Sequence, residues 1–187
     1  DVADMDGDGD LDVVVSNAYG ATHLRVFTND GSGSLSGPDQ YTLSHHTQDL
    51  VLVDLDNDGA IDVAVAAYDA NHLWVLFNDG TGDLSTQSSY DVGGTHPAWL
   101  AAGDIDGDGD VDLAVETSGN AGAGAKVRLF LNDGDRMFSG STSYDLAGYT
   151  RGMLLVDLDR DGDPDLVYNN LATPGPGTVA GTTFSVR

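Results

Sequence analysis

The sequence predicts an all-β protein made of four similar repeats, each folded as a four-stranded antiparallel sheet. Three observations support this fold class. A nine-residue acidic string occurs at residues 4–12, 54–62, 104–112 and 157–165. Short runs of β-branched residues adjoin these strings, and an Asn-Asp-Gly hairpin signal follows three of them. Repeats of about 50 residues that contain only strand signals are typical of β-propeller blades.

The acidic strings, named here acidic loops 1 to 4, share one pattern. Each has Asp at positions 1, 3, 5 and 9, and Gly at position 6. Carboxylates this close together repel one another unless a cation lies between them. An all-oxygen set of about six to seven ligands suits calcium better than zinc or copper. Solvated Asp/Gly turns are the simpler alternative, but four copies in one register favour a metal.

The residues that follow each acidic loop exclude an EF-hand. An EF-hand loop ends with Glu at position 12, whereas this chain has Val15, Val65, Val115 and Tyr168 there. Runs typical of strands follow the loops at 11–15, 61–65, 111–115 and 166–168. Similar runs precede the last three loops at 50–53, 99–102 and 153–156. We therefore expect each acidic loop to be the tip of a β-hairpin.

Apolar residues at positions 2 and 8 are expected to anchor the loops in the core. Position 2 holds Met5, Leu55, Ile105 and Leu158, and position 8 holds Leu11, Ile61, Val111 and, in the last loop, Pro164. Proline is tolerated at the start of a strand. Two further strands surround Asn-Asp-Gly at 29–31, 78–80 and 132–134. The acidic loops and the Asn-Asp-Gly turns should then share one rim, and the other connections the opposite rim.

With these strands and loops, the chain resembles the FG-GAP/VCBS repeat family, whose calcium loops follow the pattern D-x-D-x-D-G-x-x-D. The resemblance covers nearly the whole chain and implies a calcium-binding β-propeller like the head of integrin α chains. It implies about four Ca²⁺ ions, one per repeat, bound by the side chains of positions 1, 3, 5 and 9 and by the carbonyl of position 7. The implied ligands are Asp4, Asp6, Asp8, Asp10, Asp12, Asp54, Asp56, Asp58, Ala60, Asp62, Asp104, Asp106, Asp108, Asp110, Asp112, Asp157, Asp159, Asp161, Asp163 and Asp165.

We expect a single domain over residues 1–187. Its repeats lie at about 1–49, 50–98, 99–152 and 153–187, and the first and last are incomplete. Propellers of this family usually have about seven blades, and this chain has signal for about four. The blades are therefore expected to belong to a larger propeller, or to one that a second copy completes through its open strand edges.

Composition excludes several classes of function. The formal net charge is −24, but most of the carboxylates lie in the acidic loops. A nucleic-acid-binding face is not expected, because the chain has a single lysine, Lys126. No apolar stretch is long enough for a transmembrane helix, so no membrane insertion is expected. Because open loops of this kind bind calcium at about 10⁻⁵ to 10⁻³ M, we expect an extracellular or cell-surface location.

The rim opposite the acidic loops is the expected ligand face. All five histidines lie in or beside its connections, and the pair Tyr19 and His23 recurs as Tyr68 and His72. The candidate ligand-binding residues are Tyr19, His23, Tyr68, His72, His45 and His96. Aromatic rings with polar tips suit a glycan or a protein surface. Packing residues inherited with the repeat are an equal alternative.

We therefore expect a recognition or adhesion module in which calcium is structural and a glycan or protein binds the opposite face. The alternative is the propeller domain of a secreted polysaccharide-degrading enzyme, either a lyase or a hydrolase. No catalytic motif is evident in this segment. A pair such as Glu116 with a loop Asp is the nearest approach to acid/base chemistry.

Overall fold

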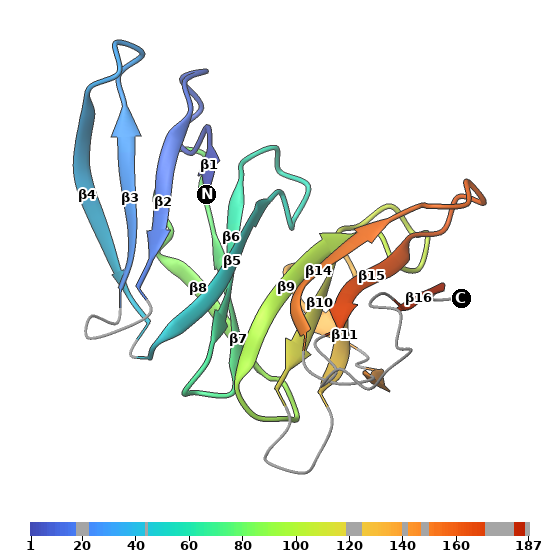
Figure 1. Ribbon diagram of the computed structural model, residues 1–187. Coiled ribbons are helices and arrows are strands. Elements are labelled where there is room, and N and C mark those ends of the chain that lie inside the picture. The colour runs from blue at the N-terminus through green and yellow to red at the C-terminus, as the bar shows by residue number, and fades with distance from the viewer. Residues whose placement is uncertain are drawn as a thin grey trace.

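The computed structural model describes residues 1–17, 23–43, 45–118, 125–139, 142–146 and 150–170, and the backbone of 182–185 (Figure 1). Every regular element in these residues is a β-strand. In chain order they are β1 (Val2–Ala3), β2 (Asp12–Ser16), β3 (His23–Asn29), β4 (Leu35–Thr42), β5 (Thr47–Val53), β6 (Asp62–Ala67), β7 (His72–Phe77), β8 (Thr86–Asp91), β9 (Pro97–Gly103), β10 (Asp112–Thr117), β11 (Lys126–Asn132), β12 (Phe138–Ser139), β13 (Ser143–Asp145), β14 (Thr150–Val156), β15 (Asp165–Asn170) and β16 (Thr182–Ser185).

The strands form four antiparallel sheets, which follow one another across Figure 1 from blue to red. The strand orders are β1-β2-β3-β4, β5-β6-β7-β8, β9-β10-β11 with both β12 and β13 paired to β11, and β14-β15-β16. The predicted all-β class and the antiparallel order within each repeat are confirmed. The third sheet divides its last strand into β12 and β13, and three strands of the fourth sheet are described.

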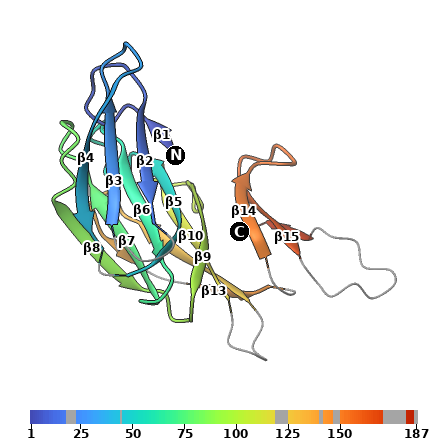
Figure 2. The same ribbon diagram turned by 60° about the vertical axis from the view of Figure 1, so that its left-hand side comes forward.

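The sheets pack against one another through alternate side chains of their strands. All six residues of β6 are buried. Val63 and Val65 pack toward the first sheet, whereas Ala64 and Ala66 pack toward the third. Burial of a valine side chain stabilises the fold by roughly 1.5–3 kcal/mol. Two-sided burial explains why this strand is apolar without alternation, and Figure 2 shows the first two sheets layered side by side.

Position 2 of the acidic loops packs toward the sheet that follows. Met5, Leu55 and Ile105 are buried between successive sheets, which confirms them as anchors. The prediction is wrong for Leu158, whose side chain is 54% exposed. The reason is that no sheet follows the fourth among the described residues, so this leucine has no partner layer.

Position 8 packs in the opposite direction, toward the preceding sheet. Ile61 packs against the core between the first two sheets, and Val111 against the core between the second and third. Leu11 is 60% exposed, so the prediction is wrong there, because no described sheet precedes the first. Pro164 lies directly before β15, as expected for a proline at a strand start.

Candidate metal centres

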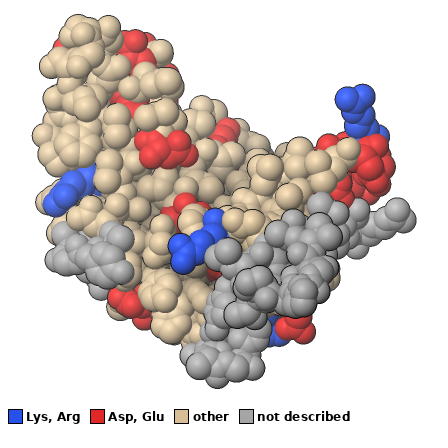
Figure 3. Space-filling view, in the orientation of Figure 1, with Lys and Arg blue, Asp and Glu red and all other residues tan. Residues whose placement is uncertain are grey.

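The acidic loops bring carboxylate oxygens together at four places. One oxygen of each carboxylate at positions 1, 3 and 5 lies within 4.8 Å of the others in loops 1 to 3, and in loop 4 the group is made by positions 1, 3 and 9. The groups are Asp4, Asp6 and Asp8; Asp54, Asp56 and Asp58; Asp104, Asp106 and Asp108; and Asp157, Asp159 and Asp165. Separate acidic clusters are visible in Figure 3.

Hydrogen bonds from the loop backbone hold the carboxylates in these positions. In loop 1, Asp4 accepts the N–H groups of Gly7 at 2.8 Å and Gly9 at 3.0 Å. Asp8 accepts the N–H of Asp10 at 2.9 Å. In the other loops the position 5 carboxylate likewise accepts the N–H of position 7, which is Ala60, Asp110 or Asp163. Gly9 has a φ of +95°, a region that favours glycine. This turn explains why position 6 is glycine in every loop.

The predicted ligands at position 7 therefore lie at the end of the turn, with their N–H groups directed toward position 5. That arrangement is compatible with the expected role of their carbonyl oxygens, which stays a prediction. Position 5 of loop 4, Asp161, accepts a hydrogen bond from Asp163 at 3.0 Å, but it is not a member of the converging group there. The shell of loop 4 thus differs from those of the first three loops.

Position 9 has a structural role that the sequence did not reveal. Asp12 is buried, and its two oxygens accept the N–H groups of Met5 and Asn29, both at 2.8 Å. Asp62 and Asp112 make the equivalent pairs of bonds. Burial raises the pKa of Asp62 and of Asp112 to about 6. These carboxylates join each loop to the hairpin of the same repeat, and their ligation of a metal stays a prediction.

The donor set fits a hard divalent cation. Burial, followed by repulsion from Asp8, raises the pKa of Asp6 above its ordinary value. Partial desolvation and repulsion from Asp161 raise the pKa of the exposed Asp159 in the same direction. In loop 2 the buried Oδ1 of Asp54 has no hydrogen-bond partner. Mutually repelling carboxylates and an unsatisfied buried oxygen are both relieved by a bound cation, and oxygen donors suit Ca²⁺.

The Asn-Asp-Gly hairpins lie on the same rim as the acidic loops, as predicted. The side-chain amide of Asn78 donates to the carbonyl of Met5, in the preceding repeat, and to that of Ile61 in its own. Asn132 repeats this arrangement with Leu55 and Val111. The recurrence of Asn directly after an apolar strand is the sequence signal for this contact, although the pattern by itself indicates only a turn.

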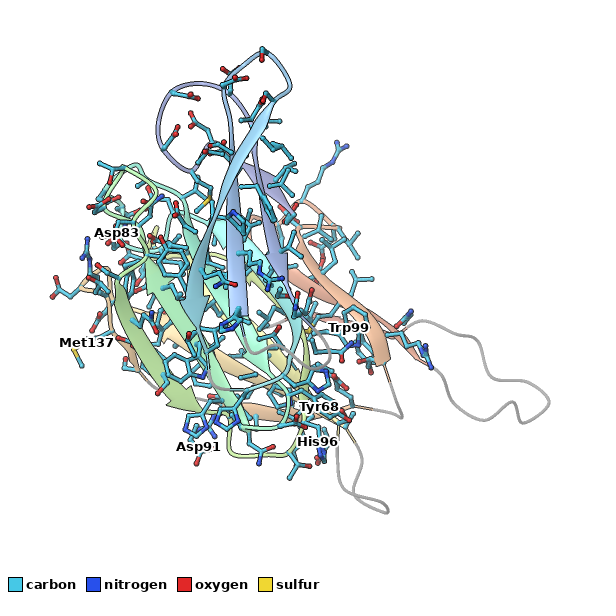
Figure 4. The ribbon with its side chains drawn as sticks, turned by 90° about the vertical axis from the view of Figure 1, so that its left-hand side faces the viewer. Tyr68, Asp83, Asp91, His96, Trp99 and Met137 are labelled. Atoms are coloured by element: carbon cyan, nitrogen blue, oxygen red, sulfur yellow. The ribbon has the colours of Figure 1, made fainter. Side chains whose placement is uncertain are left out.

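The opposite rim brings two of the predicted residues, Tyr68 and His96, together with two that were not predicted for the ligand face, His46 and Asp69. The Tyr68 ring lies between two imidazoles, with its centroid 5.3 Å from that of His46 and 4.6 Å from that of His96 (Figure 4). His46 Nδ1 lies 3.3 Å from a carboxylate oxygen of Asp69. The N–H of His96 donates to the Asn71 side chain at 2.9 Å. We name His46, Tyr68, His96 and Asp69 the histidine–tyrosine cluster.

The other predicted ligand-face residues lie outside this cluster. His23 Nδ1 is 3.3 Å from the Thr42 hydroxyl, across the first sheet. His72 is turned toward its own connection, with Nδ1 2.7 Å from the Ala70 carbonyl. His45 is exposed beside His46, and Tyr19 lies outside the described residues. The repeated Tyr-x-x-x-His pair therefore does not define the cluster, which joins the β4–β5, β6–β7 and β8–β9 connections.

The fold and the acidic loops together define a class of all-β repeat proteins with oxygen-rich loops at their hairpin tips. Comparison with known families agrees with this class. The model of the FG-GAP-like repeat family matches residues 4–65, 54–115 and 118–168. The chain belongs to the FG-GAP-like repeat family. No curated protein matches the sequence. The described residues contain no helix that could span a membrane.

Proposed function

We propose that this chain is a calcium-stabilised recognition module of the β-propeller type. The observation that carries the proposal is the convergence of three carboxylates within 4.8 Å in each acidic loop. Position 1, 3 and 5 side chains would hold the ion in loops 1 to 3, and positions 1, 3 and 9 in loop 4. A bound Ca²⁺ supplies charge neutralisation at each hairpin tip. Because only the folded loop gathers these ligands, calcium binding stabilises the fold.

The sheets are proposed to be blades of a propeller. Their first strands support this, because β5 lies beside β9 and β9 beside β14, as the inner strands of neighbouring blades do. A larger chain or a second copy would supply the remaining blades. The proposed location is extracellular or at the cell surface, because open oxygen-rich loops of this kind bind calcium at about 10⁻⁵ to 10⁻³ M.

The histidine–tyrosine cluster is the proposed ligand surface. An aromatic ring offers an apolar face, and imidazole and carboxylate groups offer hydrogen bonds at its edges, which is the combination that glycan hydroxyls or a protein surface require. The backbone around His96 is firmly held, because its carbonyl accepts the N–H of Ser118 at 3.2 Å and the Ser118 hydroxyl at 2.9 Å. These bonds fix the backbone that places the His96 ring beside Tyr68.

We propose that the module binds its ligand without transforming it. Glu116 is the acid whose burial most favours general acid chemistry, since burial raises its pKa to about 7. However, its side chain is 1% exposed and its neighbour Thr150 belongs to the fourth sheet. Most glycoside hydrolases use two carboxyl groups that face one substrate. The alternative of a polysaccharide-degrading enzyme is therefore the weaker proposal for these residues.

The test is a glycan array probed with the purified chain in calcium and in excess EDTA. Tyr68→Ala and His96→Ala are expected to weaken calcium-dependent binding by about tenfold or more while the protein remains folded by circular dichroism. His23→Ala is the matched control, because its imidazole contacts Thr42 and lies outside the cluster. A folded protein that binds no glycan would favour a protein, rather than a glycan, as the ligand. An unchanged melting temperature in EDTA would contradict the structural role of calcium.

A further inference from the structure

A basic side chain from the third repeat lies over acidic loop 2. Arg136 Nε forms an ion pair with Asp56, and Arg136 Nη2 lies 3.3 Å from an oxygen of Asp58. The guanidinium carbon is 5.3 Å from the centre of the Phe77 ring, within the range of a cation–π contact. The Asp56 side chain is only 3% exposed. This ion pair is therefore less screened than one in open solvent.

The hairpin that carries Arg136 is fixed by the second repeat. The Tyr90 hydroxyl donates to the Arg136 carbonyl at 3.4 Å and accepts the N–H of Phe138 at 3.4 Å. Arg136 itself has a φ of +61°, a conformation that costs a non-glycine residue of the order of 1 kcal/mol. The backbone contacts therefore hold Arg136 in a place where its side chain reaches the acidic loop.

The second repeat provides an internal comparison, because Gly82 holds the same place as Arg136. The Tyr41 hydroxyl donates to the Gly82 carbonyl at 3.0 Å, as Tyr90 does to Arg136. Gly82 also has a positive φ, of +83°, and a Cβ built there would lie 3.7 Å from the Cβ of Asp6. The two hairpins are thus seated alike over loops 1 and 2. They differ in whether a side chain extends toward the carboxylates. The two hairpins can be found in Figure 4 by the labels of Asp83 and Met137, which follow Gly82 and Arg136 in the sequence.

We propose that Arg136 is a built-in counter-cation that lowers the calcium affinity of acidic loop 2 below that of loop 1. This inference rests on the proposed calcium sites and concerns their regulation. Arg136 and a metal ion share the carboxylates of Asp56 and Asp58, so that ion binding weakens or displaces two ion pairs. Any guanidinium that stays nearby also repels the ion. Loop 2 still has an oxygen available to ligate a metal ion, because the buried Oδ1 of Asp54 accepts no hydrogen bond.

Two consequences follow as calcium falls. Loop 2 empties before loop 1, because its ion has a competitor that the protein itself supplies. Once empty, loop 2 keeps a positive charge between its carboxylates, and the second and third repeats remain joined by the Arg136 ion pairs. The junction between the second and third repeats therefore keeps one ionic contact that does not depend on calcium.

The amide groups of Gly9 and Gly59 allow each loop to be followed separately. Each N–H donates to the position 1 carboxylate of its own loop at 3.0 Å, so its NMR signal should shift when that carboxylate binds a metal. In a ¹H–¹⁵N titration with CaCl₂, the midpoint at Gly59 is expected to be about tenfold higher than at Gly9. Arg136→Gly should lower the Gly59 midpoint by a similar factor and leave Gly9 unchanged.

The reciprocal variant introduces a counter-cation at loop 1. Gly82→Arg places a guanidinium beside Asp6 and is expected to raise the midpoint at Gly9 while leaving Gly59 unchanged. Arg25→Gln is the charge-matched control, because Arg25 Nε bonds to Gln40 on the first sheet and its loss should alter neither midpoint by more than about twofold. If the Arg136→Gly spectrum shows unfolding, Arg136→Gln removes the same charge while it retains a side chain over Phe77.

The outcomes separate this inference from the proposed function. If both glycines respond to calcium but Arg136→Gly and Arg136→Gln leave the Gly59 midpoint in place, the counter-cation role is overturned. If neither glycine responds to calcium in the wild-type protein, the calcium sites themselves are overturned, and with them the basis of the inference. A Gly9 midpoint that rises in Gly82→Arg supports the inference independently of any variant in the third repeat.

Discussion

Asn78 donates its side-chain amide to the carbonyl of Met5 at 2.7 Å, across the boundary between two repeats. The same amide donates to Ile61 in its own repeat at 3.0 Å. Its Oδ1 accepts the N–H groups of Gly80 and Gly82. One buried side chain thus fixes its own turn and holds the preceding acidic loop. Asn132 makes the equivalent contact to Leu55 at 2.6 Å, so neighbouring repeats are joined in the same way at two junctions.

Replacement of Asn78 by Ala should destabilise the protein by about 2–4 kcal/mol, because the buried Met5 carbonyl and three part-buried backbone groups lose their partner at once. Urea denaturation in calcium measures this loss as a lower midpoint. Asn29→Ala is the matched control, since the Asn29 amide donates to Leu11 of its own repeat and to no other repeat that the structure describes. Equal losses in the two variants would show that the contact between repeats contributes nothing.

Leu84 and Leu35 hold equivalent places after the hairpin turns of the second and first repeats. Leu84 is fully buried, whereas Leu35 is 53% exposed. Leu84→Ala should therefore cost about 2–5 kcal/mol of unfolding free energy, the range for a leucine removed from a packed core. Leu35→Ala should cost less than about 1 kcal/mol. Thermal melts of the two variants check the difference, and a large loss at Leu35 would mean that this leucine is covered in solution.

Calcium removal should lower the melting temperature by several degrees. Saturation at a hundredfold excess over the dissociation constant stabilises a folded site by about 2.7 kcal/mol, and 1 kcal/mol corresponds to roughly 2–4 °C in a domain of this size. Differential scanning calorimetry in CaCl₂ and then in EDTA measures the shift. Asp6→Asn should reduce the shift, whereas Asp39→Asn, a change on β4 away from the acidic loops, should leave it unchanged.

Glu116 should make stability depend on pH. Burial raises its pKa from an ordinary 4.5 to about 7, so the folded protein holds this proton more tightly than the unfolded chain. Its contribution is fully present below about pH 4.5 and is lost as pH rises through about 7, an effect of about 3 kcal/mol. Between pH 5 and 8 the unfolding free energy of the wild-type protein should therefore fall relative to that of Glu116→Gln, which has no carboxyl group to ionise at this position. Parallel pH profiles for the two proteins would rule out this burial effect.

Much of the fold was predictable because the same local sequence pattern occurs four times. Spacing of Asp by twos around Gly9 or Gly59 specifies one turn, and the apolar runs beside it specify strands. The family resemblance was confirmed by the three matches along the chain. The rim shared by the acidic loops and hairpins followed from strand order alone, since antiparallel neighbours return to the same end.

The remaining features depend on contacts between repeats, which local pattern does not encode. The pattern of loop 4 predicted a buried anchor at Leu158, because the pattern cannot show whether another sheet covers it. The repeat also suggested His72 for the ligand face, yet the fold brings His46 and His96 to Tyr68 from two different connections. Arg136 was hidden for the same reason, since its partners lie in the preceding repeat.

The amide of Asn78 changes how the chain can be divided. A fragment cut immediately before β5 would keep acidic loop 1 but lose the hairpin that holds it, and a fragment that starts there would keep Asn78 without its Met5 acceptor. We therefore expect the unit of cooperative folding to run from one acidic loop to the hairpin of the next repeat, as nearest-neighbour coupling predicts for stacked repeats. Truncations and grafts designed on that overlapping unit should remain soluble, whereas those cut at the sequence repeat should not.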